Sequence, residues 1–139
     1  MTPALAFVAL GSNLGDRAKT ISDALAGLGA TPGVRVLETT DPVATTPLGG
    51  LDQPEYLNAM VLLEVTISPA ELLRCCQELE RRAGRIRRER WASRELDLDI
   101  VMFGDVIADD PMLRLPHPGL HDRPFWQDQL AQLGAVRDG

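Results

Sequence analysis

Residues 56–84 read YLNAMVLLEVTISPAELLRCCQELERRAG and contain the clearest strand-to-helix junction in the chain. Their first part, Tyr56–Ile67, is rich in aliphatic and β-branched residues, which is typical of a buried strand. Ser68–Glu71 then places Ser at the N-cap, Pro at N1 and Glu at N3, so it predicts a capping box. Gly84 follows the last apolar residue at helical spacing and is expected to end this helix.

The upstream segment repeats the combination of strand and helix. Ala4–Leu10 is apolar and predicts a buried strand, and Asp16 can cap a helix whose apolar residues recur at helical spacing. Val34–Thr40 predicts a second strand. Residues 41–55 contain three prolines and two glycines with little periodicity, so they predict a long loop.

The downstream segment completes the pattern. Residues 85–93 predict an arginine-rich loop and Glu95–Phe103 a fourth strand, followed by a hairpin turn into a short strand at Val106–Ala108. Asp122–Leu133 has the pattern of a final amphipathic helix. The order β-α-β-β-α-β predicts an α+β fold, a ferredoxin-like sandwich with helices on one face of an antiparallel sheet. Residues 1–139 are expected to form one domain.

The composition excludes several classes of protein. The chain is 45% hydrophobic and 24% charged, which is typical of a globular protein and excludes wholesale disorder. No stretch approaches the roughly 18–20 apolar residues of a membrane helix, and the N-terminus lacks the pattern of a secretory signal, so we expect a cytoplasmic protein. Cys75 and Cys76 are adjacent on a predicted helix and are expected to be free thiols.

The distribution of charge predicts an anion site. The net charge is -6, which disfavours a general nucleic-acid-binding protein. Half of the 14 lysines and arginines nevertheless lie close together, as Arg81, Arg82, Arg85, Arg87, Arg88, Arg90 and Arg94. Arginine offers two parallel donors to a phosphate, and so many like charges repel one another unless an anion binds. A solvated loop is the alternative interpretation.

The segment RELDLDI places two acidic residues, Asp97 and Asp99, at alternate positions of the fourth predicted strand. Alternate residues share one face of a strand, so the two carboxylates project together, roughly 6.5–7 Å apart, while the leucines are buried on the other face. Such a pair can hold Mg²⁺, and a metal beside arginines is the recurring arrangement for phosphoryl transfer. The alternative is the solvated side of a half-buried strand.

Two further segments carry candidate functional residues. In GSNLGD, which starts at Gly11, the glycines allow a tight strand-to-helix turn and Asn13 can bind a ligand, although a simple capped turn is equally compatible. His117 lies between two prolines in a stiff loop, and its pairing with His121 lacks the context of a zinc site. The chain contains no Gly-Lys pair and therefore no Walker A motif.

Four segments taken in order, FVALGSNLGDR, PEYLNAMVLLEV, GRIRRERWASRELDLDIVMFGD and LPHPGLHDRPF, resemble the 6-hydroxymethyl-7,8-dihydropterin pyrophosphokinases of folate synthesis. The resemblance spans residues 5–126. It implies transfer of the pyrophosphoryl group of ATP to the hydroxymethyl oxygen of the pterin, release of AMP, two Mg²⁺ ions and a ferredoxin-like fold.

The resemblance also implies roles for individual residues. Asp97 and Asp99 match the metal-binding aspartates, and Arg85, Arg94 and Asp97 are expected to act in the chemical step. The ATP side is expected to comprise Gln77, Glu80, Arg85, Arg87, Arg94, His117 and Arg123. The pterin side is expected to comprise Asn13, Thr45, Leu48, Tyr56, Asn58, Trp91 and Phe125.

Some features depart from the family pattern and leave alternatives open. Ala92-Ser93 stands where Gly-Pro is usual, a threonine stands in Thr45–Pro47 where proline is common, and the sequence ends earlier than the family pattern. One alternative is therefore a non-catalytic or retuned paralogue that binds a pterin or a nucleotide. Another is a ferredoxin-like RNA-binding module, which predicts exposed aromatic residues on the sheet, whereas only 4% of the residues are aromatic. The expected partners are ATP and the pterin, with no nucleic acid or membrane, and the expected state is a monomer.

Overall fold

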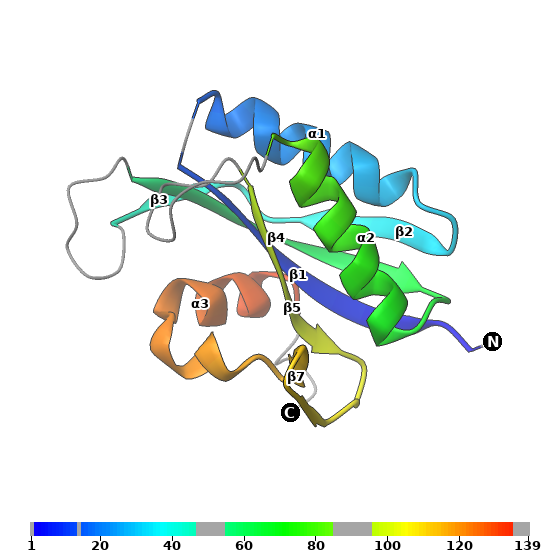
Figure 1. Cartoon of the computed structure of the whole chain (residues 1–139). Coiled ribbons are helices and arrows are strands. Elements are labelled where there is room, and N and C mark those ends of the chain that lie inside the picture. The colour runs from blue at the N-terminus through cyan, green and yellow to red at the C-terminus, as the bar shows by residue number, and fades with distance from the viewer. Residues whose placement is uncertain (1, 14, 47–54, 85–95, 135–139) are drawn as a thin grey trace.

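The computed structural model describes residues 2–13, 15–46, 55–84 and 96–134. Its centre is an antiparallel sheet with strand order β2-β4-β1-β5, to which β3 adds by pairing with β4 (Figure 1). The strands are β1 (Ala4–Ser12), β2 (Val34–Thr39), β3 (Val43–Thr45), β4 (Tyr56–Val65) and β5 (Asp97–Phe103). The predicted antiparallel α+β fold is confirmed.

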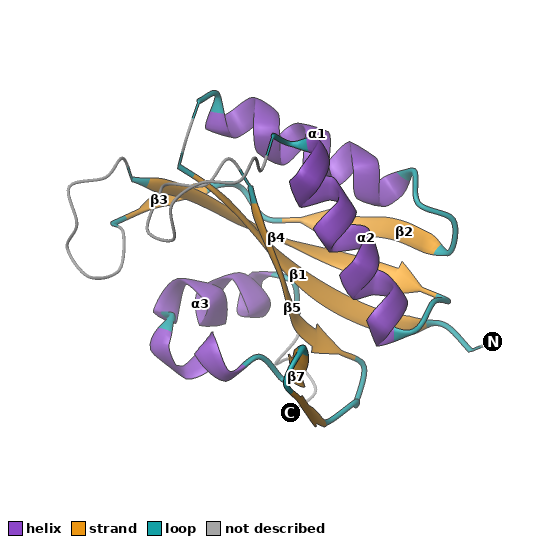
Figure 2. Ribbon diagram, viewed as in Figure 1, coloured by secondary structure: helices purple, strands orange, loops and turns teal. Residues whose placement is uncertain are grey.

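Helices cover both faces of the sheet, as Figure 2 shows. The helices α1 (Arg17–Gly29) and α2 (Pro69–Arg82) lie over one face, and α3 (Pro124–Gln132) lies over the other. The predicted ferredoxin-like sheet, with the helices of its two βαβ halves on one face, is confirmed by α1 and α2, and α3 adds a cover on the other face. The physical reason is that β1 and β4 run through the middle of the sheet with apolar residues on both faces, and each face needs a cover.

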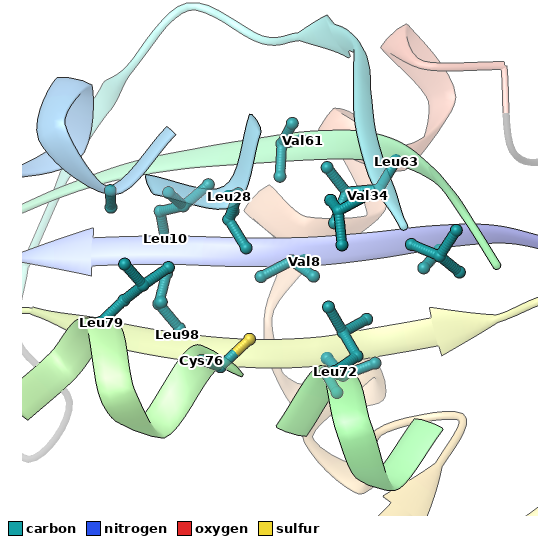
Figure 3. Close-up of a cluster of buried hydrophobic side chains, with 14 of the residues drawn as sticks. Val8, Leu10, Leu28, Val34, Val61, Leu63, Leu72, Cys76, Leu79 and Leu98 are labelled. Atoms are coloured by element: carbon teal, nitrogen blue, oxygen red, sulfur yellow. The ribbon is translucent and has the colours of Figure 1, made fainter. Parts of the chain in front are cut away.

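Alternate residues of β1 separate the two hydrophobic cores. Val8 and Leu10 are buried beneath α1 and α2, where Figure 3 shows them packed with Leu28, Leu72 and other aliphatic side chains. The alternating residues of β1, Phe7 and Ala9, point the other way and pack against α3. They belong to a second cluster that comprises Phe7, Ala9, Met60, Val101, Trp126, Leu130 and Leu133. The period of two along a strand thus assigns each residue to one core.

The helix starts agree with the local sequence signals. The capping box of α2 is present: Ser68 Oγ accepts from the Glu71 backbone N–H at 3.2 Å, and Glu71 Oε1 accepts from the Ser68 N–H at 3.0 Å. Asp16 caps α1 by accepting from the Lys19 N–H at 3.1 Å. These bonds satisfy amide groups that the first turn of a helix leaves without partners.

The loop predicted at 41–55 contains a strand that the sequence analysis missed. Strand β3 pairs with the start of β4, on the same side of β4 as β2. Thr40 closes the break between the two strands, because its N–H donates to the Met60 carbonyl at 2.9 Å and its Oγ1 accepts from the Met60 N–H at 2.9 Å. This short strand depends on pairing with β4 rather than on a pattern of its own.

The segment after β5 also differs from the prediction. The short strand expected at Val106–Ala108 is instead a separate hairpin of β6 (Ala108–Asp110) and β7 (Leu113–Leu115). A 3-10 helix, η1 (Pro118–Asp122), then precedes α3. The C-terminal helix is confirmed with somewhat shorter bounds. Among the described helices, none is long and apolar enough to cross a membrane.

Candidate active site

The candidate site lies on the α3 face of the sheet, where three strands present one residue each in a row. Gly11 of β1 pairs with Asn58 of β4 on one side and with Asp97 of β5 on the other. Since neighbouring strands lie about 4.8 Å apart, Asn58 and Asp97 stand roughly 10 Å from each other. Asn58 shares its face with Met60 of the α3 cluster, so its side chain belongs to the α3 side.

Gly11 has no side chain, so its neighbours can approach the backbone in the middle of this row. A Cβ atom at Gly11 would lie 3.1 Å from Asn58 Oδ1 and 3.6 Å from Tyr56 Cδ1. The sequence analysis assigned Gly11 to a turn, but it lies inside β1, and Gly15, with a φ of 64°, is the glycine whose backbone requires the turn. The missing side chain at Gly11 therefore provides a floor between an amide and a carboxylate.

The two aspartates occupy the positions that the sequence pattern predicts. Asp97 and Asp99 are half-buried on β5, and the leucine between them is buried in the opposite core. The backbone is fixed at this point because the Leu98 N–H donates to Glu80 Oε2 at 2.9 Å. Glu80 is itself only 7% exposed, so α2 holds the aspartate-bearing strand from the opposite face.

The loop after β7 brings His117 to Asp99. The His117 N–H donates to the Val101 carbonyl at 2.9 Å, and His117 Nε2 lies 3.6 Å from Asp99 Oδ1. His117 Nδ1 accepts from the Gly119 N–H at 2.9 Å, which leaves the ring hydrogen on Nε2, the nitrogen that faces Asp99. The imidazole is thereby oriented by the backbone on one side and by a carboxylate on the other.

Trp126 holds the polar residues of the loop and of α3 together. Its ring packs edge-to-face with His117 at a centroid distance of 5.0 Å, and Arg123 Cζ lies 4.7 Å from the centre of the indole. Arg123 also donates to the Gly119 carbonyl at 3.2 Å, and Phe125 packs edge-to-face on Trp126 at 6.4 Å. Trp126 is 3% exposed, so a buried ring fixes two residues that the sequence predicts on the ATP side.

The residues predicted on the pterin side gather at the other end of the row. Asn58 Nδ2 donates to Thr45 Oγ1 at 2.5 Å, and Thr45 pairs with Tyr56 across the β3–β4 ladder. Asn13, immediately after β1, is 1% exposed. Strand β3 therefore delivers Thr45 to the amide of Asn58, a contact that the loop prediction did not contain.

The remaining predicted residues are placed as follows. Gln77 is exposed on α2, the helix that packs on the opposite face of the sheet. Outside the described residues lie Leu48, Arg85, Arg87, Trp91 and Arg94, together with the predicted arginine-rich loop.

The donor set fits a hard divalent cation. Within the described ranges, no group of three or more His, Cys, Asp and Glu side chains gathers as a complete metal cage. Asp97 and Asp99 instead offer two carboxylates on one face, and Mg²⁺ is commonly bound by one or two carboxylates together with substrate phosphates.

On the opposite face, burial, reinforced by the charges of Glu80 and Asp99, raises the pKa of Cys76 to about 12, so this thiol stays protonated.

The sequence as a whole matches the family model of 7,8-dihydro-6-hydroxymethylpterin-pyrophosphokinase over residues 7–135. The chain belongs to this family. It is similar to the 2-amino-4-hydroxy-6-hydroxymethyldihydropteridine pyrophosphokinase of Methylorubrum extorquens, with 37% identity over 92% of this chain and 81% of that protein. The enzyme of the same name from Haemophilus influenzae is 38% identical over 86% of this chain and 75% of its own length.

A larger relative contains the same region. The folic acid synthesis protein fol1 of Schizosaccharomyces pombe is 39% identical over 87% of this chain, and the match covers 16% of that protein. Family membership makes the chain a pyrophosphokinase that transfers pyrophosphate from ATP to hydroxymethyldihydropterin in folate synthesis. The predicted family, activity and enzyme class are confirmed, and the comparisons favour them over an RNA-binding module.

Three residues of the site escaped the sequence analysis. Gly11 was assigned to a turn, Trp126 received no role, and the buried Gln129 of α3 was not singled out. The signals were weak: a glycine inside an apolar run, a tryptophan between an Arg-Pro-Phe segment and a polar stretch, and a glutamine at a core-facing helix position. Each depends on neighbours that are distant in sequence.

Proposed function

We propose that ATP and the pterin meet above the Asn58–Gly11–Asp97 row, and that this row carries out the family reaction. The observation that carries the proposal is that an amide and two carboxylates share one face of the sheet, separated by a residue without a side chain. The amide at one end of the row supports a flat ligand there, and the carboxylates at the other end support phosphates. We further propose that the protein is a single-domain monomer and that it is cytoplasmic, a location that the free thiols Cys75 and Cys76 support.

The pterin end is proposed to recognise a planar heterocycle. The Asn58 side chain combines a donor and an acceptor, and its hydrogen bond to Thr45 fixes which way the amide faces. Tyr56 and Phe125 are the rings proposed to stack on the heterocycle, since aromatic faces bind planar ligands at low entropic cost. Asn13, Leu48 and Trp91 complete this side in the proposal.

The phosphate end is proposed to neutralise charge. Two Mg²⁺ ions bound at Asp97 and Asp99 would supply electrostatic stabilisation of the phosphate oxygens. His117, which lies 3.6 Å from Asp99, and Arg123, which lies over the same Trp126 ring, are proposed to bind nucleotide oxygens. Arg85, Arg87 and Arg94 are proposed to engage the phosphates, and Gln77 and Glu80 to lie on the nucleotide side.

The proposed reaction is an attack of the pterin hydroxymethyl oxygen on the β-phosphorus of ATP. The new oxygen–phosphorus bond forms as the bond between the β-phosphorus and the α,β-bridging oxygen breaks, so AMP leaves and the pterin gains pyrophosphate. The hydroxyl proton is released, and Asp97 is proposed to help accept it. The protein therefore accelerates the reaction by positioning the substrates and by electrostatic stabilisation, and it forms no covalent bond to either substrate.

A nucleotide assay tests this proposal. We expect one AMP for each pyrophosphorylated pterin, and no AMP when either Mg²⁺ or 6-hydroxymethyl-7,8-dihydropterin is omitted. Production of ADP would contradict attack at the β-phosphorus. If the purified protein formed no pterin-dependent product at all, the non-catalytic paralogue would replace the enzyme as the better interpretation.

A further inference from the structure

Gln129 of α3 is a polar side chain inside an apolar core. It is 1% exposed, and the helix positions Trp126, Leu130 and Leu133 around it belong to the hydrophobic cluster on this face. Its Nε2 donates to the backbone carbonyl of Asn58 at 3.3 Å, across 71 residues of sequence. Helix α3 is thus hydrogen-bonded to the strand residue at the amide end of the candidate site.

Packing does not explain the choice of glutamine at this position. Among the described residues, Gln129 Oε1 has no hydrogen-bond partner although it is buried. A buried polar atom without a partner destabilises the folded protein, and an apolar side chain of the same length would avoid that loss. The hydrogen bond from Gln129 Nε2 to the Asn58 carbonyl is therefore the contact that explains a carboxamide at this position.

The two ends of this hydrogen bond belong to opposite walls of the proposed pterin pocket. Asn58 and Tyr56 come from β4, and Phe125 comes from α3, one helical turn before Gln129. Trp126, which is adjacent to Phe125, holds Arg123 and His117. A shift of α3 relative to β4 would therefore change the distance between the stacking ring and the amide.

We infer that Gln129 is a positioning residue for the pterin pocket, which acts by fixing α3 to the Asn58 carbonyl. The inference rests on the proposed function of Asn58 and Phe125. It assigns Gln129 no contact with either substrate. The expected consequence of losing the bond is a defect in pterin binding, with nucleotide binding largely retained.

The variant Gln129→Met tests this inference, because methionine keeps the length of the side chain and removes the donor. We expect the KM for the pterin to rise about tenfold, the size of effect that one misplaced hydrogen bond produces, while the KM for ATP changes by less than about twofold. The matched control is Gln132→Met on the same helix, where the side chain is exposed and no change is expected.

Two results would overturn the inference. One is a Gln129→Met enzyme whose KM for the pterin equals that of the wild type. The other is a lowered Tm with KM values for both substrates raised in parallel, which is the result expected if Gln129 only stabilises the fold. If Gln129→Met does not fold, Gln129→Leu provides the second variant, since it also removes the donor while keeping the position apolar, and the same rise in the KM for the pterin is expected.

A spectroscopic measurement separates this inference from the proposed function. The side-chain amide signal of Asn58 in a ¹H–¹⁵N spectrum should shift in Gln129→Met and stay in place in Gln132→Met. If the wild type forms no AMP, the proposed function fails, and a shifted Asn58 signal would still support the positioning role. If the wild type is active and the Asn58 signal does not move in Gln129→Met, the positioning role itself is wrong.

Discussion

The face of the sheet beneath α1 and α2 and the face beneath α3 use alternate residues of the same strands. Beneath α1 and α2, the apolar residues continue along β1 to Leu10 and along β5 to Leu98. On the α3 face, the apolar cluster ends at Ala9 and Met60, and the next positions are Gly11, Asn58 and the aspartates.

This difference shows how one sheet separates stability from chemistry. On a face whose apolar residues are continuous, every buried residue raises the free energy of unfolding, by roughly 25 cal/mol for each Å² of apolar surface that is buried. A face that changes from apolar to polar residues partway along can expose carboxylates without disturbing the opposite core, because successive side chains of a strand point to opposite faces. If the two faces are independent, a substitution on one face leaves the property of the other face unchanged.

The largest effect is expected from neutralising an aspartate on the α3 face. Asp97→Asn and Asp99→Asn should each lower kcat at least about a thousandfold, because they remove the charge proposed to hold the metals. The metal-free Tm should change little, because asparagine keeps the shape of each side chain and both positions are only half-buried. AMP formation and thermal unfolding measure the two outcomes, with Asp109→Asn on β6 as the control. Retained turnover with a much lower Tm would make the aspartates structural.

The opposite result is expected from the other face. Leu72→Ala beneath α2 removes a fully buried side chain, so it should lower the free energy of unfolding by about 2–5 kcal/mol through lost transfer energy and a cavity. The KM values should stay within about twofold of the wild type at temperatures where the variant is folded. Urea unfolding and steady-state kinetics test this, and a raised pterin KM would show that the two faces are coupled.

A smaller and more specific effect is expected at the floor of the site. Gly11→Ala places a Cβ atom 3.1 Å from Asn58 Oδ1, so the amide must shift. The KM for the pterin should rise about tenfold, with a smaller change in the KM for ATP. Gly29→Ala is the control on the opposite face, because its Cβ atom would lie at an ordinary 3.6 Å from Val36 Cγ2. Equal kinetic effects of the two substitutions would contradict the role of the floor.

The smallest effect is expected at the start of α2, far from either substrate. Ser68→Ala removes the capping box and should lower Tm by about 2–8 °C without changing kcat. Hydrogen bonds from Ser68 hold the pKa of Glu71 below its ordinary value. That contribution is fully present above the ordinary carboxylate pKa and is lost as the pH falls through the lowered value. Its largest part comes from the Ser68 backbone N–H, which alanine keeps, so Ser68→Ala should weaken the acid-pH dependence of unfolding only slightly.

Local patterns explain which features the sequence could predict. The capping box of α2 involves residues three positions apart, and the aspartates of β5 alternate over three positions, so a short window contains all the information. The order of the main strands and helices follows from such windows. The family resemblance then supplied roles for residues, such as Asn58 and His117, that local chemistry alone left open.

The features that the sequence analysis missed depend on pairing between distant segments. Strand β3 exists because β4 offers it a partner, and Gly11 is a floor only because Asn58 and Asp97 lie on either side of it. Placing α3 on the second face of the sheet would have required knowing that both faces of β1 are apolar in the folded protein. Gln129 has only a weak local signal, since its partner Asn58 lies 71 residues away in the sequence.

The central position of β1 determines when the site can form during synthesis. Strand β1 is made before both of its partners, β4 on one side and β5 on the other, and α3 follows later still. Pairing with β4 leaves one edge of this largely apolar strand unpaired until residue 103 has been added. Because the amide lies on β4 and the carboxylates lie on β5, on either side of β1, the proposed site is complete only after β5 has been made.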